Sequence, residues 1–302
     1  MSDPIEQFGL AIAAAGLEAP DYIEPGRIIK FPGHRKSGSN KAAWCFMFDD
    51  LRGGVFGDYS TDMESTWQAS NSAPYTPAER QAHLANIKAM QAQRDADLLT
   101  SQQHASETAA ALLGQADTAT VHPYLSRKGV QPHGVKAFGD RLLIPMHDTA
   151  GKLHSLQTIT PDGDKRFHPG GRIKACYHAI GKPAGLLVVC EGYATGASIH
   201  EATGHAVAVA FNAGNLLAVA TALYKKYPAL TIVMAADDDW RTEGNPGLTS
   251  AKQAAMTVGG FVVRPYFSAD RPPKATDFND LAALAGLSAV RACFLEVEVF
   301  SC

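Results

Sequence analysis

Four short apolar stretches, separated by segments with a helical pattern, occupy the C-terminal part of the chain. Each stretch has the length and the apolar character of a buried strand. The stretches are residues 186–190, 206–211, 230–236 and 261–267. The segments between them have helical patterns that end near residues 203, 227 and 258, just before Gly204, Pro228 and Gly259. Strands that alternate with helices in this way predict a parallel sheet with helices on both faces.

Carboxylates follow three of these four stretches. Glu191 comes directly after the first stretch, and Asp237 and Asp239 come after the third. Asp277 and Asp280 follow the fourth after a loop. The functional site of a parallel sheet lies beyond the carboxyl ends of its strands, so all five side chains are expected at one edge. Alternate residues of an extended segment point the same way, so Asp237 and Asp239 can face one ligand.

This set of acids favours a bound cation. Two carboxylates about 6 Å apart repel each other by roughly 3 kcal/mol at an effective dielectric constant of about 20. Mg²⁺ prefers a few carboxylates, water and substrate phosphates, and a site with such metals suits phosphoryl transfer. Any one of these acids is also explained as a helix N-cap or a solvated loop charge. The complete set in this order is what favours a metal site.

The motifs around the acids resemble the Toprim domain. Its signature is a buried strand that ends in Glu-Gly and a later strand that ends in Asp-x-Asp. DnaG-type primases share it with type IA and type II topoisomerases, OLD-family nucleases and the RecR recombination protein. Taken together, four motifs are similar to those of primases from plasmids and phages: EGYATGAS (191–198), FNAGNL (211–216), ADDD with NPGLTSA (236–251) and TDFNDL (276–281). Three upstream stretches resemble the module that precedes Toprim in those proteins: residues 57–67, 122–130 and 142–167.

The resemblance implies a DNA primase from a mobile genetic element. Such an enzyme makes short RNA primers on single-stranded DNA during replication, by metal-dependent nucleotidyl transfer from ribonucleoside triphosphates. The site would hold two Mg²⁺ or Mn²⁺ ions, and a replicative helicase is a possible partner. Asp237 and Asp239 would bind metal, Glu191 would bind metal or act as acid and base, and Asp277 and Asp280 would complete the set.

One residue departs from the DnaG-type pattern. Those enzymes carry another acid four residues after the motif glutamate, where this chain has Thr195. The metal set is then smaller, or Asp277 and Asp280 supply what is missing. The N-terminal zinc ribbon and the C-terminal helicase-binding domain of replicative primases are not visible in the sequence.

Two other functions fit the same acids. A Toprim nuclease would use water as the nucleophile, and a DNA-binding replication accessory would use the domain as a scaffold. The primase-like upstream module favours the primase over the nuclease, and the near-complete acidic set argues against the accessory. A topoisomerase is disfavoured because no accompanying domain is large enough to carry a strand-cleaving tyrosine.

The N-terminal part of the chain predicts a mixed α+β module. A long helix is expected over residues 77–113, because Thr76 and Glu79 form a capping box around Pro77. A hairpin is expected from residues 142–148 and 153–159. We therefore expect two domains, an N-terminal module over 1–182 and a Toprim catalytic domain over 183–302.

Local basic patches are the candidates for nucleic-acid binding, because the net charge of the chain is only −3. Residues 25–48 contain basic side chains and no acid, although a charge run is usually a solvated face. Trp44 or Trp67 could stack on bases, although aromatic residues there also fit a core. The candidate DNA-binding residues are Arg27, Lys30, Arg35, Lys36, Lys41, Arg127, Lys128, Lys165 and Arg166.

Nucleotide phosphates have a second set of candidates at the acidic edge. Asn212, Gly214 and Asn215 follow the second strand, where they form either a phosphate-binding turn or an ordinary one. Lys252 could reach a phosphate or be a solvated helix lysine. The five cysteines include no CxxC pair, which argues against zinc and for a reducing cytoplasm. No apolar run is long enough to span a membrane.

Overall fold

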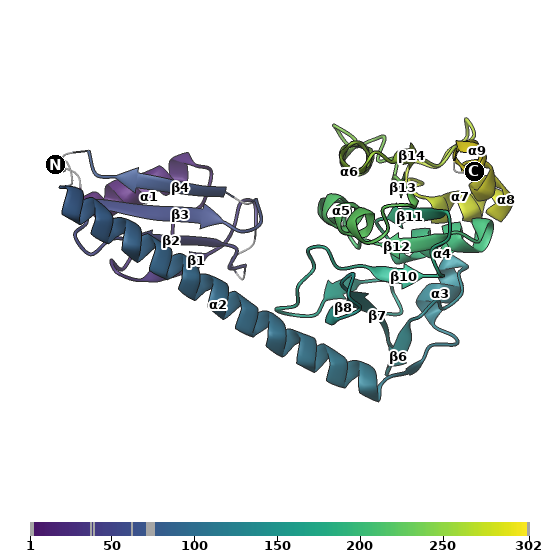
Figure 1. Ribbon diagram of the computed structural model, residues 1–302, viewed down its shortest axis with the longest axis horizontal. Coiled ribbons are helices and arrows are strands. Elements are labelled where there is room, and N and C mark those ends of the chain that lie inside the picture. Colours follow the sequence, from purple (N-terminus) through teal and green to yellow (C-terminus); the bar gives the residue numbers. More distant parts are fainter. Residues whose placement is uncertain (1–2, 37, 39, 62, 71–75, 301–302) are drawn as a thin grey trace. The chain divides into compact units, whose positions relative to one another are not determined.

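The protein folds as two compact units joined by a long helix (Figure 1). A computed structural model describes residues 3–36, 38, 40–61, 63–70 and 76–300. Contacts divide the chain into residues 1–90 and 91–302. That division falls inside the long helix, whereas the domain boundary expected from the sequence lies at 182/183.

The first unit is a four-stranded antiparallel sheet with a short N-terminal helix and the first part of the long helix packed against it. The strands are β1 (Ile28–Phe31), β2 (Ala43–Met47), β3 (Gly53–Asp58) and β4 (Met63–Gln68), in that order across the sheet. Helix α1 (Pro4–Ala14) buries Phe8 and Ile12 in the same core as Met47 and Phe56. The β3 strand is buried throughout, and β4 alternates between partly buried and exposed residues.

Helix α2 (Pro77–Gln115) confirms the predicted long helix, with two more residues at its end. The Thr76 amide donates to Glu79 Oε2 at 2.7 Å, and the Glu79 amide donates to Thr76 Oγ1 at 3.3 Å, so the predicted capping box is present. Only Ala105, Ser106 and Ala109 of this helix are buried. The Ser106 hydroxyl donates to the Leu153 carbonyl oxygen at 2.7 Å, which fixes the end of α2 to the second unit.

The second unit begins with an antiparallel sheet. Its strands follow chain order: β5 (Asp117–Thr118), β6 (Lys136–Phe138), β7 (Arg141–His147), β8 (Leu153–Ile159) and β9 (Lys165–Phe167). Helix α3 (Pro123–Lys128) lies between β5 and β6 in sequence. The β7–β8 pair is the predicted hairpin. Its turn is closed by Asp148 Oδ1, which accepts from the amides of Ala150 at 2.9 Å and Lys152 at 3.0 Å.

The C-terminal sheet has the order β10-β12-β11-β13-β14 and confirms the predicted parallel arrangement of four strands. A fifth strand, β10, pairs antiparallel with β12 at one edge and was not expected. The strands are β10 (His178–Ile180), β11 (Leu186–Cys190), β12 (Ala206–Val209), β13 (Thr231–Ala235) and β14 (Phe261–Val263). The helices are α4 (Tyr193–Thr203), α5 (Leu216–Lys226), α6 (Pro246–Val258), α7 (Phe278–Ala285), α8 (Leu287–Ala292) and α9 (Leu295–Phe300), and a short 3₁₀ turn, η1, covers Ala213–Asn215.

Helices cover both faces of this sheet, as expected. On one face of the sheet, the strands share a core with Leu216 and Val219 of α5 and Ala254 of α6. The second core contains α4, α7 and α8, and it also contains Leu142 and Ile144 of β7. The antiparallel sheet and the C-terminal sheet therefore share a single hydrophobic core.

Candidate active site

Four carboxylates meet at the carboxyl edge of the C-terminal sheet. Glu191 follows β11, Asp237 and Asp239 follow β13, and Asp277 is the N-cap of α7. Burial raises the pKa of Asp237 well above its ordinary value, and the charges of Asp277, Glu191 and Asp239 raise it further. Burial, Asp239 and Asp277 raise the pKa of Glu191 in the same way. The four groups are therefore close enough to repel one another.

Asp237 has the chemistry expected of a cation ligand. Its Oδ1 atom is buried and accepts no hydrogen bond from the part of the protein that the structure describes. A buried carboxylate oxygen without a donor is unfavourable unless a cation or a proton satisfies it. Among the described residues, no three His, Cys, Asp or Glu side chains are arranged to hold an ion by themselves. Mg²⁺ needs only one or two protein carboxylates when water and substrate phosphates complete its shell, so this set still fits it.

The three consecutive aspartates have different surroundings, as the alternation of an extended segment predicts. Asp238 is 5% exposed, and its Oδ2 accepts from Arg271 at 2.6 Å while its Oδ1 accepts from Asn245 at 2.8 Å. Asp239 lies with Asp237 instead, and its Oδ2 accepts from the Gly247 amide at 3.2 Å. A Cβ at Gly247 would lie 2.9 Å from the Asp237 carbonyl oxygen, so any other residue there would force the surrounding loop to shift.

Asp280 holds the backbone at the start of α7. Its Oδ2 accepts from the Asp277 amide at 3.4 Å, and Asp277 Oδ1 accepts from the Asp280 amide at 2.8 Å, which together form a capping box. The same Asp280 oxygen also accepts from the Thr276 amide at 2.8 Å. Asp280 thus has a structural role in this cap, and its place among the metal ligands stays a prediction. The Asp-x-x-Asp spacing itself is a signal that could have indicated this role. The Thr195 hydroxyl, at the position of the missing acid, hydrogen-bonds to Asp277.

Two lysines bring positive charge to the acids. The pKa of Lys165, on β9, is lowered by burial and by Lys128, while Asp277, Glu191 and Asp237 act in the opposite direction. Lys165 is exposed as a residue, so it can also reach solvent or a bound nucleotide. Lys128 at the end of α3 also lowers the pKa of Asp277. Sequence reasoning named both lysines as DNA contacts and missed their place beside the acids, because they lie far away along the chain.

The turn after β12 positions Glu191. Phe211 has a left-handed φ of 73°, and its amide donates to the Glu191 carbonyl oxygen at 2.8 Å. The Ala213 amide hydrogen-bonds to the Glu191 carboxylate. Asn215 is buried, accepts from the Ala175 amide at 2.8 Å, and donates to the carbonyl oxygens of Cys176 and Ala210 at 3.0 and 2.9 Å. Its amide is thus used by the fold.

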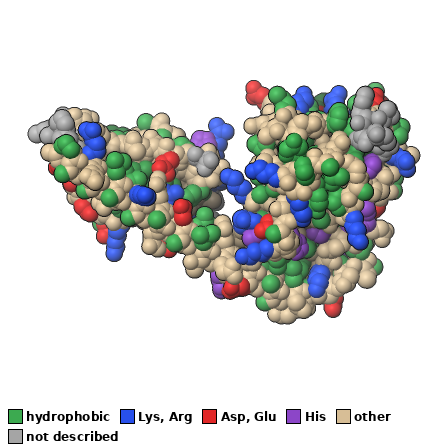
Figure 2. All heavy atoms as spheres, in the orientation of Figure 1, with side chains coloured by type: hydrophobic (Ala, Val, Ile, Leu, Met, Phe, Trp, Pro, Cys, Tyr) green, Lys and Arg blue, Asp and Glu red, His purple; other side chains and the backbone are tan. Residues whose placement is uncertain are grey.

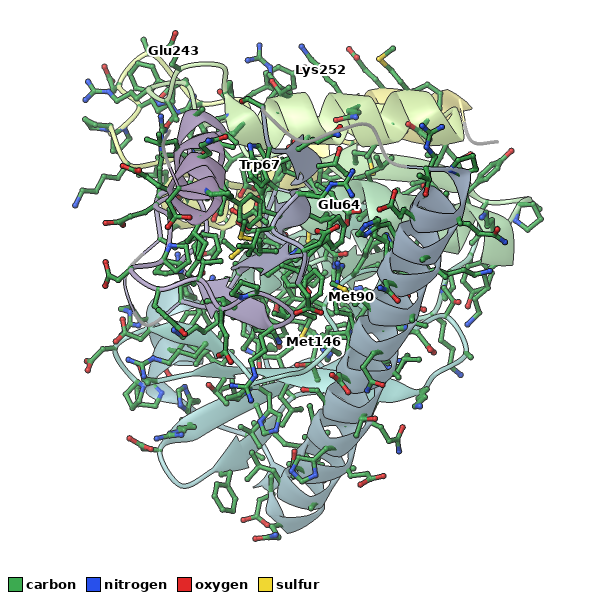
Figure 3. The ribbon with its side chains drawn as sticks, turned by 90° about the vertical axis from the view of Figure 1, so that its left-hand side faces the viewer. Glu64, Trp67, Met90, Met146, Glu243 and Lys252 are labelled. Carbon is green, nitrogen blue, oxygen red and sulfur yellow. The ribbon has the colours of Figure 1, made fainter. Side chains whose placement is uncertain are left out.

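The other phosphate candidates on this edge remain open to solvent. Gly214 is exposed and Asn212 is half-buried. Lys252 is exposed and points outward from α6 (Figure 3). These three positions remain predicted contacts for nucleotide.

The basic residues expected to hold DNA lie on the surface. In the first unit Arg27, Lys30, Arg35, Lys36 and Lys41 are all exposed. The Arg27 guanidinium lies 3.0 Å from Glu24, which is also partly exposed. In the second unit Arg166 is exposed, and Arg127 donates to the Pro161 carbonyl oxygen at 2.8 Å.

The two tryptophans considered for base stacking, Trp44 and Trp67, pack against other aromatic or apolar side chains of the first unit. Trp44 is 3% exposed and belongs to a core cluster with Phe48 and Val55. The ring of Trp67 packs 5.2 Å from that of Phe8, centroid to centroid.

Within the described part of the chain, no helix has the length and apolar character to cross a membrane.

The chain resembles a known domain family and several known proteins. Residues 186–288 match the Toprim domain family. Two proteins of Escherichia coli named DNA primase TraC are 36% identical over 284 residues and 33% identical over 305 residues. The matches cover 88% and 93% of this chain but only 26% and 20% of those relatives. A solved structure of the DnaG primase catalytic domain bound to ssDNA covers 66% of this chain and 80% of its own, at 13% identity and a TM-score of 0.45. Residues 186–288 are therefore a Toprim domain, within a chain that is related over most of its length to the TraC DNA primases.

Proposed function

We propose that this chain is the primer-synthesising part of a DNA primase. It would join ribonucleotides into short RNA primers on single-stranded DNA. The observation that carries the proposal is the set of half-buried, mutually repelling carboxylates of Glu191, Asp237 and Asp277, in a chain that matches the Toprim domain family and has relatives named DNA primases. The site has the charge that nucleotidyl transfer requires, and the relatives favour that reaction over others of the same charge.

Asp237, Asp239 and Glu191 would hold Mg²⁺ or Mn²⁺, with two ions as the expected number and Asp277 beside them. When bound, such ions supply Lewis-acid activation and neutralise charge on the phosphates. The residue types fit, because the partnerless Asp237 Oδ1 and the raised pKa of Asp237 both indicate that a positive charge is missing there.

The remaining groups of the site would bind and orient the nucleotides. The ammonium groups of Lys165 and Lys128 lie beside the acids, so they can attract a triphosphate to an edge that would otherwise repel it. Glu191 has a raised pKa, which brings it closer to the value at which a carboxylate can accept a proton from a hydroxyl and release it again. The Ala213 amide holds the Glu191 carboxylate in place for that exchange.

The template would be held by basic surfaces without base-specific contacts. The candidates are the exposed lysines and arginines of residues 27–41 and those of residues 127–128 and 165–166. A replicative helicase is a possible partner of such a primase. The elements of plasmids and phages that carry similar primases suggest its biological setting, in DNA replication of a mobile element.

A nuclease is the second candidate, because the same carboxylates and metal could direct water instead of a primer hydroxyl. One assay separates the two functions. The protein is incubated with single-stranded DNA, labelled ribonucleotides and Mg²⁺ or Mn²⁺, and the products are resolved by size. Short labelled oligomers on intact template support the primase, cut template supports the nuclease, and neither product supports a DNA-binding accessory.

Variants of the acids make the assay specific. Asp237→Asn and Asp239→Asn should abolish primer synthesis while the fold remains intact. Glu243→Gln is the matched control, since Glu243 is an exposed acid in the loop that follows these aspartates (Figure 3). Full synthesis by either aspartate variant would show that these residues do not bind the metal.

A further inference from the structure

An open, basic groove of about 810 Å³ lies along α5, outside the acidic site. It is lined on one side by α5 itself, which provides Thr221, Lys225 and Lys226. Thr149 from the β7–β8 turn and Lys174 from the segment before β10 complete it, and Gly214 lies at one end. Figure 2 shows Lys and Arg side chains in blue over the part of the surface where Figure 1 draws α5.

The groove carries three positive charges and has no acid in its lining. Lys174, Lys225 and Lys226 are all exposed, and none of them pairs with a carboxylate among the described residues. The acid next to Thr149, Asp148, is already satisfied by His154 at 2.8 Å and Arg172 at 3.3 Å. The groove is therefore a site of net positive potential.

One simpler explanation accounts for only part of this charge. Lys225 and Lys226 lie in the last turn of α5, where cations favour the helix dipole. Lys174 comes from a different segment and serves no helix end. The Lys226 ammonium donates to the Thr149 carbonyl oxygen and lies 5.2 Å from the centre of the Tyr227 ring, so its position is defined by the fold.

The groove starts at the turn that holds the active-site glutamate. Gly214 belongs to the lining, and the neighbouring Ala213 amide binds Glu191. From that turn α5 runs for 11 residues, or about 16 Å at 1.5 Å per residue. A strand with phosphates spaced by roughly 3.4 Å along its axis would place several of them over this length.

We propose that this groove binds the sugar-phosphate backbone of a nucleic-acid strand that leads to or from the acidic site. This inference rests on the proposed function, which supplies the reason for a nucleic-acid strand to end at the acidic site. The open shape and the spread of three charges along a helix favour an extended polymer over a single compact anion. Leu217, Ala218 and Ala222 provide apolar surface between the charges, which suits the faces of sugars.

The test is the salt dependence of single-stranded DNA binding, measured by fluorescence anisotropy in EDTA and without nucleotides. The groove variant is Lys174→Gln with Lys225→Gln, which leaves the Lys226 contact intact. The control is Lys182→Gln with Arg291→Gln, two exposed cations outside the groove. Each lost phosphate contact lowers the slope of log K against log salt by roughly 0.7 for single strands, so the groove variant should lose about 1.4. Between 50 and 200 mM salt the wild type should then lose about sevenfold more affinity than the groove variant.

The outcomes separate this inference from the proposed function. Equal salt slopes for the wild type and both variants would show that the groove does not bind the DNA backbone. This conclusion would hold even if primers are still made at saturating template. A reduced slope for the groove variant alone, in a protein that makes no primers, would support the groove and overturn the primase. Isothermal titration with inorganic triphosphate covers the remaining case. Binding of triphosphate that the groove variant loses, with an unchanged DNA slope, would identify a small-anion site and overturn the strand.

Discussion

Replacing Asp237 by asparagine should stabilise the metal-free protein while it abolishes activity. Burial and the charges of Asp277, Glu191 and Asp239 raise the pKa of Asp237, and the charge of Lys165 opposes them. At neutral pH the folded state therefore carries either a repelled charge or a proton that the unfolded chain does not hold. Asparagine has nearly the same shape and carries neither.

The linkage between protonation and folding sets an upper limit on the stability that Asp237→Asn can gain. Keeping a carboxyl protonated at pH 7 against its ordinary pKa of 3.8 costs about 1.36 kcal/mol for each of about 3.2 pH units, or about 4 kcal/mol in all. We expect about 2 kcal/mol, because Lys165 offsets part of the repulsion and Asp237 keeps some contact with water. In a unit of this size the gain corresponds to a rise of roughly 4–8 °C in Tm.

The pH dependence of folding stability tests independently whether the carboxyl of Asp237 destabilises the metal-free protein. A carboxyl with a raised folded-state pKa binds more protons folded than unfolded between its ordinary pKa and the raised one. Stability should therefore fall as pH rises through a window that starts near the ordinary values of 4.5 for Glu191 and 3.8 for Asp237 and Asp277. Asp237→Asn should flatten this fall in EDTA.

The neighbouring aspartate is the control, because its expected change has the opposite sign. Burial alone would raise the pKa of Asp238, but hydrogen bonds from Arg271 and Asn245 and the charge of Arg271 lower it overall. Its ionised form therefore stabilises the fold above pH 3.8, and this contribution is lost as pH falls through the lowered pKa. Asp238→Asn should cost about 3 kcal/mol, because it removes the carboxylate that neutralises the half-buried Arg271 guanidinium.

Urea denaturation of both variants in EDTA decides the matter. The two adjacent substitutions should change stability in opposite directions. This is expected only if Asp237 lies in a cluster of repelling carboxylates and Asp238 is neutralised by its hydrogen-bond partners. A loss of stability in Asp237→Asn similar to that in Asp238→Asn would refute the cluster and the metal site inferred from it.

Three further predictions test other parts of the structure. Mg²⁺ or Mn²⁺ should raise the Tm of the wild type, since ligand binding stabilises the native state, and the rise should shrink in Glu191→Gln; equal shifts would remove Glu191 from the metal site. Charge reversal of Lys36 and Lys41 together should lower the salt slope of single-stranded DNA binding by about 1.4 and leave nucleotide binding intact, whereas superimposed binding lines would show a solvated loop. Gly247→Ala should reduce metal affinity more than it reduces stability, because its Cβ would lie 3.0 Å from Asp239 Oδ2; unchanged affinity in a calorimetric titration would mean that the loop adjusts freely.

Strand and helix patterns were enough to predict the C-terminal sheet. The apolar run of β11 has the same bounds in the structure as in the prediction, because nothing polar interrupts it. The β10 strand was missed, since its three residues, His178–Ile180, have no strand pattern of their own and are extended only because β12 is beside them. The apolar segment at 261–267 was expected to be extended throughout, but the strand ends at Val263.

The acids were predicted better than their surroundings. Topology alone places Glu191, Asp237 and Asp277 together, and a period of two separates Asp238 from its neighbours. The approach of Lys165 could not be predicted, because it depends on how the antiparallel sheet packs against the C-terminal sheet. The sequence shows only a short basic run at that point, which looks the same as a solvated face.

The shared hydrophobic core limits how this protein can be divided or recombined. A fragment that starts at residue 183 would contain every acid of the site, yet it would lack β10 and leave the edge of β12 unpaired. It would also expose the side chains that now contact Leu142 and Ile144 of β7. We expect such a fragment to aggregate rather than to fold as a free-standing catalytic domain. Exchange of parts between related primases, in evolution or in the laboratory, should therefore transfer the two sheets together.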